Sequence, residues 1–467
     1  MPAVKSDFLA DPLGLTEDHA DPLDETNTDP PHPSDMRYQR WYASGVVLPI
    51  NAVLILSGTD QDTSLGPPGS QFFPPCASTQ DSAGCSKVRY TAPEVYFPET
   101  DTTLALESAG KLLNMYPRSY VVQTGPGWDD WKVAVTSEAS GDFLPGLSTI
   151  GQYDPWFYDG NTYLLDVQAA LADPDRDTPG TSHWEFVDQA QIAHDGGAGA
   201  QLWKLDSEGR AISQRVVLFG GSCGRVPRGE SGEPLFECDR STVEMIDYES
   251  ASPTWEQQAP LIKPASQNNA VVLPNGKVVI VGGATGRGPW DNTFHLQMFD
   301  PEMGTITPLV ETQVARHDHS TVALLPDGSV AILGGNATDL SGEVDHLDAG
   351  IPVAQIYRPS YLMGGPRPVI DKVQDNLRYG KLFKIRVSAQ SPIASVAIIR
   401  MGPVTHNWDW GNRYAELAIT QVKHGSVLSV RAPAAPGLAV PGHYQLFVVD
   451  ENGIPSEAAV VHLGHDE

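Results

Sequence analysis

Two imidazoles and a carboxylate stand within three residues of one another in the segment Arg316-His317-Asp318-His319-Ser320. Imidazole nitrogens bind zinc and copper, and a carboxylate is a harder oxygen ligand. Asp318 could therefore ligate a metal, and His317 could serve as an alternative imidazole ligand. A lone histidine such as His319, at a strand start beside a turn, is more often an ordinary hydrogen-bonding residue. The segment alone leaves both roles open.

Four cysteines form two local pairs in stretches rich in Gly, Pro and Ser, Cys76 with Cys85 and Cys223 with Cys238. Neither pair has the Cys-x-x-Cys spacing or the nearby histidines of a zinc site. We therefore predict two loop disulfides, 76–85 and 223–238, and an oxidising compartment, which means a secreted or cell-surface protein. No apolar signal peptide or transmembrane run is visible in this chain, so no membrane insertion is expected.

The composition favours an all-β protein with an acidic surface. The 467 residues include 44 Gly and 39 Pro, and 58 acidic residues against 30 basic ones give a formal net charge of −28. Such a charge argues against binding to nucleic acid or to anionic membranes. Residues 1–36 are acidic and rich in proline, so they are predicted to be a disordered acidic leader.

A repeat positions the His-Asp-His segment. Residues 315–335 have the pattern of a strand, a Pro-Asp-Gly turn, a second apolar strand and a Gly pair, and residues 269–283 repeat that pattern. Residues 215–221 repeat its second half. The Gly pairs begin at residues 220, 282 and 334, which are 62 and 52 residues apart. A period near 50 with this punctuation predicts a kelch-type β-propeller with one four-stranded blade per repeat.

Five blades are recognisable between residues 37 and 363. The first has Ser57 in place of the first Gly of the pair, the second starts near 115–118, and residues 124–214 are poorly patterned with insertions. Short strands with frequent turns follow over 364–467 and predict an immunoglobulin-like β-sandwich.

A kelch-type propeller followed by such a sandwich resembles the galactose oxidase and glyoxal oxidase family of copper-radical enzymes, over about residues 37–465. The most specific segments are 316–320 before 325–328, 400–406 leading to Asn412-Arg413, and 441–456. The resemblance implies a seven-bladed propeller, an early-set sandwich and a copper ion on the propeller axis. Two His, an axial Tyr and a Tyr cross-linked to Cys bind this ion in the family. Alcohols or aldehydes are oxidised there while O2 becomes H2O2.

Carried over by motif, the first copper-binding His falls on His319 and the second on His406, and the cross-linked Tyr falls on Tyr42. Asp318 occupies the place of the axial Tyr. No Cys precedes Tyr42, and Asp60 occupies the place of the aromatic residue that stacks over the cross-link. A Tyr–Cys cross-link is therefore not expected, although copper could still bind.

Two functions follow. The leading hypothesis is a secreted oxidase-like protein, degenerate in the radical cofactor, that retains a metal site and binds carbohydrate or a surface partner. The alternative is an active copper-dependent oxidase of primary alcohols or aldehydes that produces H2O2.

Five blades cut from a seven-bladed geometry would leave two apolar blade faces open. We expect an incomplete ring whose open faces are covered by residues 124–214 or by a partner chain. The alternative is a ring that tightens to five or six blades.

Overall fold

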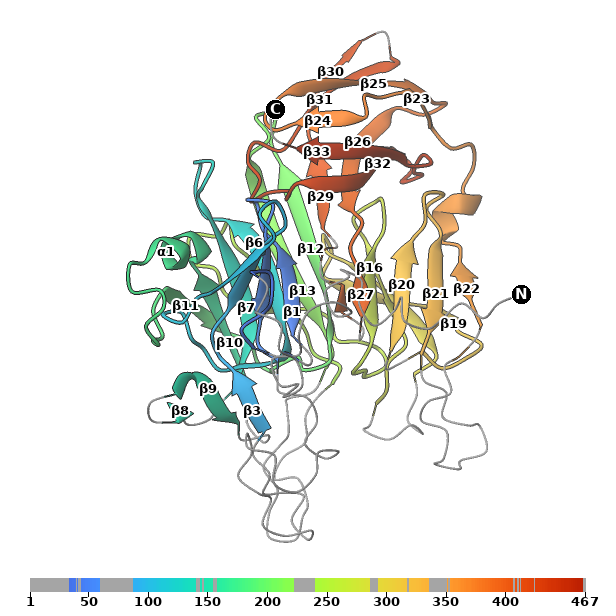
Figure 1. The fold of residues 1–467 in the computed structure, drawn as a ribbon. Helices are drawn as coiled ribbons and strands as arrows, with labels where there is room; N and C mark the ends of the chain where they lie inside the picture. Colours follow the sequence, from blue (N-terminus) through green and yellow to red (C-terminus); the bar gives the residue numbers. More distant parts are fainter. Residues whose placement is uncertain are drawn as a thin grey trace, which may run out of the picture.

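The structure is a computed structural model, and it describes residues 33–38, 40, 43–58, 87–139, 143–144, 147–153, 158–221, 240–285, 293–316, 319–335, 351, 353–405, 408–409, 411, 413–423 and 425–464. The described chain is almost entirely β, as predicted (Figure 1). Its helices are α1 (Val167–Ala172) and a 3-10 turn at Ser360–Met363. No helix in the described part of the chain is long and apolar enough to cross a bilayer.

Five antiparallel sheets follow one another along the chain, each with its strands in chain order. The first contains β1 (Ser44–Val47), β2 (Val53–Leu56), β4 (Glu94–Phe97) and β5 (Thr102–Ala105), and the second β6 (Leu113–Gln123), β7 (Trp131–Ala139), β10 (Tyr158–Leu165) and β11 (Trp184–Gln189). The third contains β12 (Ala198–Leu205), β13 (Ala211–Phe219), β14 (Val243–Asp247) and β15 (Glu256–Gln257). The fourth contains β16 (Asn269–Val272), β17 (Val278–Val281), β18 (His295–Asp300) and β19 (Thr305–Glu311), and the fifth β20 (Ser320–Leu324), β21 (Val330–Gly334) and β22 (Gln355–Tyr357).

Residues 124–214 differ from the sequence-based expectation. This segment supplies most of the second sheet and much of the third, so it does not form a separate insert over open sheet faces. Its strands are long and shift register, for instance between Thr162 and Tyr163, which hides the repeat pattern in the sequence. A separate small sheet contains β3 (Lys87–Tyr90), β8 (Phe143–Leu144) and β9 (Leu147–Tyr153).

The hairpin turn and the Gly pair predicted from the repeat are both present in the fourth sheet. In the fourth sheet, Leu273 and Lys277 close the Pro-Asn-Gly hairpin, in which Gly276 has a φ of 78°. Beyond β17, Gly282 has a φ of 64°, and a Cβ there would overlap the carbonyl oxygen of Arg316. Only glycine combines this conformation with so close an approach.

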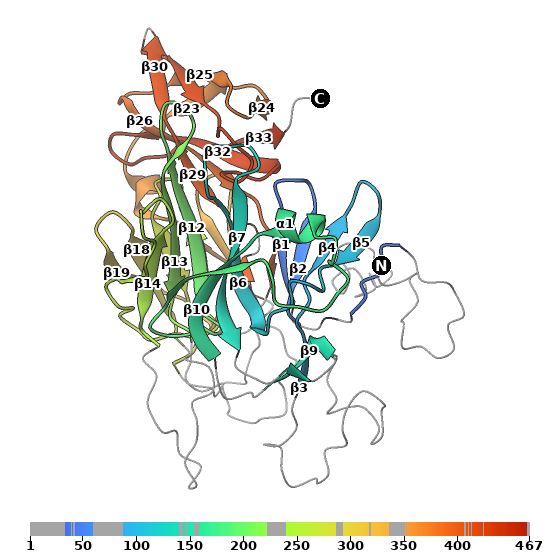
Figure 2. The same cartoon turned by 90° about the vertical axis from the view of Figure 1, so that its left-hand side faces the viewer.

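The innermost strands of successive sheets are neighbours in space. β1 packs on β6, β12 on β16, and β16 on β20. Tyr120 of β6 joins Trp203 of β12 in one buried cluster. Figure 2 shows the first sheet on one side of the molecule, the third and fourth on the other, and the second between them. Among the described residues, no comparable contact joins the fifth sheet to the first, so the sheets do not form a closed ring.

Two layers of strands form the C-terminal region. One sheet contains β23 (Val369–Lys372), β25 (Leu382–Ser388), β31 (Val427–Arg431) and β30 (Ile419–Lys423). The other contains β24 (Asn376–Arg378), β33 (Ala459–Gly464), β32 (Gly442–Asp450), β26 (Ile393–Arg400) and β29 (Tyr414–Leu417). β29 pairs in parallel with β12, which makes this layer and the third sheet one nine-stranded sheet. The C-terminal region is therefore fused to the third sheet by backbone hydrogen bonds.

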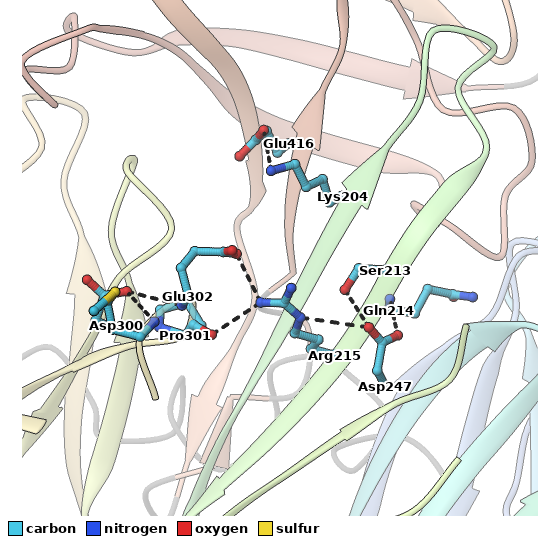
Figure 3. Close-up of polar contacts among 10 residues, drawn as sticks. Lys204, Ser213, Gln214, Arg215, Asp247, Asp300, Pro301, Glu302 and Glu416 are labelled. Atoms are coloured by element: carbon cyan, nitrogen blue, oxygen red, sulfur yellow. Dashed lines mark hydrogen bonds and ion pairs between the residues drawn. The ribbon is translucent and has the colours of Figure 1, made fainter. Parts of the chain in front are cut away.

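Polar contacts on interior strands of this fused sheet connect three regions (Figure 3). Arg215 on β13 contacts Glu302 of the fourth sheet, with Nη1 and Oε1 2.9 Å apart, and Asp247 on β14, with Nε and Oδ2 3.7 Å apart. Lys204 on β12 lies 3.5 Å from Glu416 on β29. These side chains are partly exposed, so they fix orientation more than they add stability.

Candidate functional site

Of the residues carried over from sequence, the structure describes His319. Tyr42, Asp318 and His406, together with the alternative ligand His317, lie outside the described residues. The same is true of Asp60 and of all four cysteines, Cys76, Cys85, Cys223 and Cys238, so both disulfides stay predictions. The structure therefore constrains the candidate site through His319 and through the elements that carry its other members.

His319 directly precedes β20 and is exposed, with a left-handed backbone at φ 58°. This conformation is unfavourable for a residue with a Cβ and costs about 1–2 kcal/mol. Ser320, the next residue, is buried, and its Oγ accepts a hydrogen bond of 2.8 Å from Asn269 Nδ2 of the fourth sheet. The start of β20 is thus fixed against the neighbouring sheet while the imidazole stays accessible.

Arg316 anchors the other side of the His-Asp-His segment. Its side chain is fully buried and donates hydrogen bonds to the Gly334 carbonyl at 2.5 Å, to the Val353 carbonyl at 2.6 Å and to Gln355 Oε1 at 3.0 Å. Burial lowers the pKa of this guanidinium. Because Arg316 and Ser320 are both fixed, the two ends of the segment that holds Asp318 and His319 are held in place.

His319 occupies a position that recurs in the first, third and fourth sheets. In each of these sheets and in the fifth, one inner-strand residue pairs with the last residue before the Gly pair or its Ser-Gly equivalent. In the fifth, fourth, third and first sheets this residue is Thr321, Asn269, Ala198 and Ser44. The residues two positions earlier are His319 (φ 58°), Gln267 (φ 55°), Gly196 (φ 66°) and, by sequence count, Tyr42. By sequence count, His319 and Tyr42 thus both precede equivalent strand positions, Thr321 and Ser44, by two residues. The residue types themselves, His and Tyr, do not indicate this equivalence, which follows only from the strand register.

A hairpin from the C-terminal region reaches the same strands. β27 (Val404–Thr405) pairs with β28 (Trp408–Asp409), β27 lies against β20, and β28 lies against β12. In Figure 1, β27 lies beside the inner strands, below the C-terminal sheets. His406 directly follows Thr405 in the chain and lies outside the described residues, so its place near the start of β20 stays a prediction.

Trp408 and Arg118 hold this hairpin, and sequence reasoning gave neither of them a role. The Trp408 ring is 2 % exposed and packs edge-on against Tyr120 of β6, with ring centroids 5.4 Å apart. The Arg118 guanidinium lies 4.6 Å from the centroid of the Trp408 ring. Arg118 also donates to the carbonyls of Gly197 and Tyr116, the latter at 2.6 Å, and burial lowers its pKa. A buried cation over an indole face is a favourable contact that ties the hairpin to the second and third sheets.

Arg413 fixes the chain after the hairpin. It donates to Gln201 Oε1 at 3.0 Å, to the Gly437 carbonyl at 2.8 Å and to the Val121 carbonyl at 2.7 Å. Burial lowers its pKa to about 10, so it stays protonated at neutral pH. One side chain thereby joins the second sheet, the third sheet and the C-terminal region.

Another histidine of the described chain, His194, has a structural role. His194 is 1 % exposed, its Nδ1 lies 2.7 Å from the Gly220 carbonyl and its Nε2 lies 3.0 Å from Glu244 Oε2. Both ring nitrogens are therefore occupied, and His194 is not available to a metal. His319, in contrast to the buried His194, is an exposed residue.

Comparisons with known proteins agree with this architecture. Residues 367–463 match the family model of the galactose oxidase-like early set domain. The chain is 31% identical over 207 residues to a galactose oxidase from Gibberella zeae, a match that covers 42% of this chain and 29% of that protein. It is 28% identical over 271 residues to the aldehyde oxidase GLOX of Vitis pseudoreticulata, covering 53% of this chain and 50% of that one. The chain thus spans half or less of these relatives.

A solved structure shares the fold. It is a fungal alcohol oxidase of the AA5 family in complex with copper, with a TM-score of 0.62 and 20% identity, and the match covers 92% of this chain and 76% of that one. The predicted resemblance to galactose oxidase and glyoxal oxidase is confirmed by these relatives and by the early set domain.

Proposed function

We propose that this chain, a relative of galactose oxidase and the aldehyde oxidases, is a kelch-type propeller of five blades with an immunoglobulin-like early-set sandwich. The propeller would occupy residues 37–363 and the sandwich 364–467, after an acidic leader at 1–36. Five sheets in chain order with neighbouring innermost strands support this assignment. The uncovered faces of the first and fifth sheets would then be available to a partner chain.

We assign a metal site to His319, His406, Tyr42 and Asp318. The observation that supports this assignment is the contact of β27 with β20, because β27 ends at Thr405, the residue before His406, and β20 begins directly after His319. Two imidazoles, a phenolate and a carboxylate suit a single copper ion. When bound, copper would supply a Lewis acid that polarises an alcohol or aldehyde oxygen.

The protein's own residues define what this site does. The fixed left-handed turn at His319 presents an imidazole to solvent, and Arg118 with Trp408 holds the opposing hairpin in place. Asp318 stands in the place of the axial Tyr of the resembled oxidases. The site is therefore proposed to be degenerate in the radical cofactor and to bind carbohydrate or a surface partner in a secreted setting. The alternative, an active oxidase of primary alcohols or aldehydes, is favoured by the names of the relatives.

Copper binding and peroxide release test these proposals together. The purified chain should bind copper at this site, and His319→Gln should remove one equivalent, as measured by metal analysis after dialysis. Oxidised protein should show no visible radical band, and no H2O2 should form from simple sugars or aldehydes. Unchanged copper content in His319→Gln would refute the metal assignment. Peroxide release that is lost in His319→Gln would establish the oxidase instead.

A further inference from the structure

Two histidines stand directly opposite each other on neighbouring strands of the C-terminal region. His443 on β32 pairs in register with His462 on β33, and the ring centroids are 5.0 Å apart with an interplanar angle of 61°. The adjacent pair, Tyr444 and Val461, is buried at 0 % and 1 % exposure. Because side chains alternate along strands, both imidazoles lie on the face of this sheet that is opposite the sandwich core, the same face from which Gln445 donates to the Leu324 carbonyl of the fifth sheet. His443 is exposed and His462 is half-buried, so the pair is reached from solvent.

These two rings differ from the other histidine side chains with known contacts. The described ion pairs place a carboxylate beside three histidines, His183 with Asp173, His194 with Glu244, and His295 with Glu311. Across the described residues, neither His443 nor His462 has a carboxylate or a hydrogen-bond partner on its ring. Their nitrogens are consequently free to act as ligands.

The spacing of the rings fits a shared metal ion. With each nitrogen about 2 Å from the metal and each ring centre about 1 Å further back, a tetrahedral angle places the ring centres about 5 Å apart. The observed separation of 5.0 Å matches this value. Side-chain rotation alone could therefore direct both nitrogens at one ion, without movement of β32 or β33.

A third donor lies next in the same row. The Met401 N–H donates to the His443 carbonyl at 3.5 Å, which extends the β26–β32 pairing one residue beyond Arg400 and Tyr444. Met401 is 46 % exposed and thus faces outward like His443. Side chains opposite each other on neighbouring strands have Cβ atoms about 5 Å apart, so a thioether can reach an ion held by the imidazoles. Thioether and imidazole ligands favour copper, and Cu+ above all, over hard cations.

We propose that Met401, His443 and His462 form a second copper site on the face of the β26–β32–β33 layer that is opposite the sandwich core. It is independent of the site at the start of β20: Figure 1 shows β32 and β33 among the upper, red strands and β20 below them. The chain's net charge of −28 favours cations over anions at such a surface.

The test uses the full chain and copper ions alone as the probe. In the His319→Gln background, which leaves the sandwich untouched, one equivalent of Cu2+ should still bind and show coupling to two nitrogens by electron paramagnetic resonance. His443→Gln and His462→Gln should each weaken that binding at least about tenfold, whereas His295→Gln, on another strand surface, should not. Met401→Leu should weaken Cu+ binding about tenfold, by competition with a colorimetric Cu+ chelator, and leave Cu2+ binding unchanged.

Two results would overturn the proposal. One is Cu2+ binding in the His319→Gln background without nitrogen coupling. The other is unchanged affinity in both His443→Gln and His462→Gln, with circular dichroism spectra and metal-free melting temperatures like those of the parent. Unchanged Cu+ affinity in Met401→Leu would remove the thioether from the site.

Discussion

The fourth and fifth sheets start their inner strands with the same backbone and different side chains. Gln267 has a φ of 55° and His319 a φ of 58°, each two residues before an equivalent strand position. Gln267 is half-buried and its N–H donates to the Gly196 carbonyl at 2.6 Å, whereas His319 is exposed. The strained turn is thus a property of the repeat and not in itself a sign of function. The chemistry depends on which side chain the turn presents.

The two sheets also differ in how tightly the first glycine of each Gly pair is packed. In the fourth sheet Gly282 touches the backbone at Arg316, while in the fifth Gly334 faces the carbonyl of His319 with more room. The fourth sheet has neighbours on both sides, β12 and β20 against β16, whereas β20 contacts β16 and the hairpin strand β27.

The largest expected effect comes from the paired glycines. Gly282→Ala should lower the free energy of unfolding by more than about 4 kcal/mol, because its Cβ would overlap the Arg316 carbonyl at a left-handed φ. Gly334→Ala should cost only about 1–2 kcal/mol, since its Cβ would lie 3.0 Å from the His319 carbonyl oxygen. Urea unfolding followed by tryptophan fluorescence measures both. Equal losses would show that the crowding difference is not real.

Arg316 gives the next largest effect. Its counterpart in the fourth sheet, three residues before Gln267, is Pro264. Arg316→Met should lower the free energy of unfolding by about 3 kcal/mol, because the oxygens that it bonds would be left buried without a donor. Arg386→Met, at an exposed position on β25, is the matched control and should change stability by less than about 0.5 kcal/mol. Similar losses in both variants would contradict the anchoring role of Arg316.

Exchanging the side chains of residues 319 and 267 tests whether copper binding depends on the side chain or on the shared backbone conformation. His319→Gln should remove one copper equivalent and leave stability within about 0.5 kcal/mol of wild type, since the side chain is exposed. Gln267→His should not add a copper equivalent, because β27 lies against β20 and not against β16. Calorimetric titration with Cu2+ gives both stoichiometries. A gain of copper binding in Gln267→His would mean that any imidazole at this turn suffices.

Sequence patterns predicted what is local to each repeat. The apolar strand Val278–Val281, the hairpin turn before it and the Gly pair after it follow from neighbouring residues, and they occur where expected. The all-β class and the family resemblance are likewise confirmed. In the second sheet the register shifts and long strands removed the local signal, so residues 124–214 were wrongly expected to be an insert.

Contacts between distant segments could not be predicted in this way. The parallel pairing of Leu202 with Tyr414 joins strands more than 200 residues apart, and nothing in either strand specifies its partner. The same holds for Arg118 over Trp408. For His319 the sequence supplied the residue, but only the strand register revealed its equivalence to Gln267.

The hairpin turns of the two sheets give the smallest expected difference, and it depends on pH. Asp327 in the fifth sheet stands where the fourth has Asn275. Burial raises the pKa of Asp327, but hydrogen bonds from the Ser329 hydroxyl and N–H outweigh it, and the net pKa lies below the ordinary value.

A carboxylate whose pKa is lowered by folding stabilises the protein above its unfolded pKa of about 3.9, and this contribution is lost as the pH falls through the folded value. Asp327→Asn keeps an oxygen acceptor as in Asn275 but cannot titrate. Between pH of about 6 and about 3, wild type should therefore lose slightly more unfolding free energy than Asp327→Asn. The effect should be small, because Asp327 is exposed and solvent weakens its interactions.

Asn275→Asp is the reverse test. The backbone N–H of Lys277 donates to the Asn275 side-chain oxygen at 3.3 Å, so this variant should gain acid sensitivity only if that N–H stabilises a carboxylate as the Ser329 donors do. Parallel stability curves for wild type and Asp327→Asn would show that the Ser329 hydrogen bonds do not distinguish the two turns.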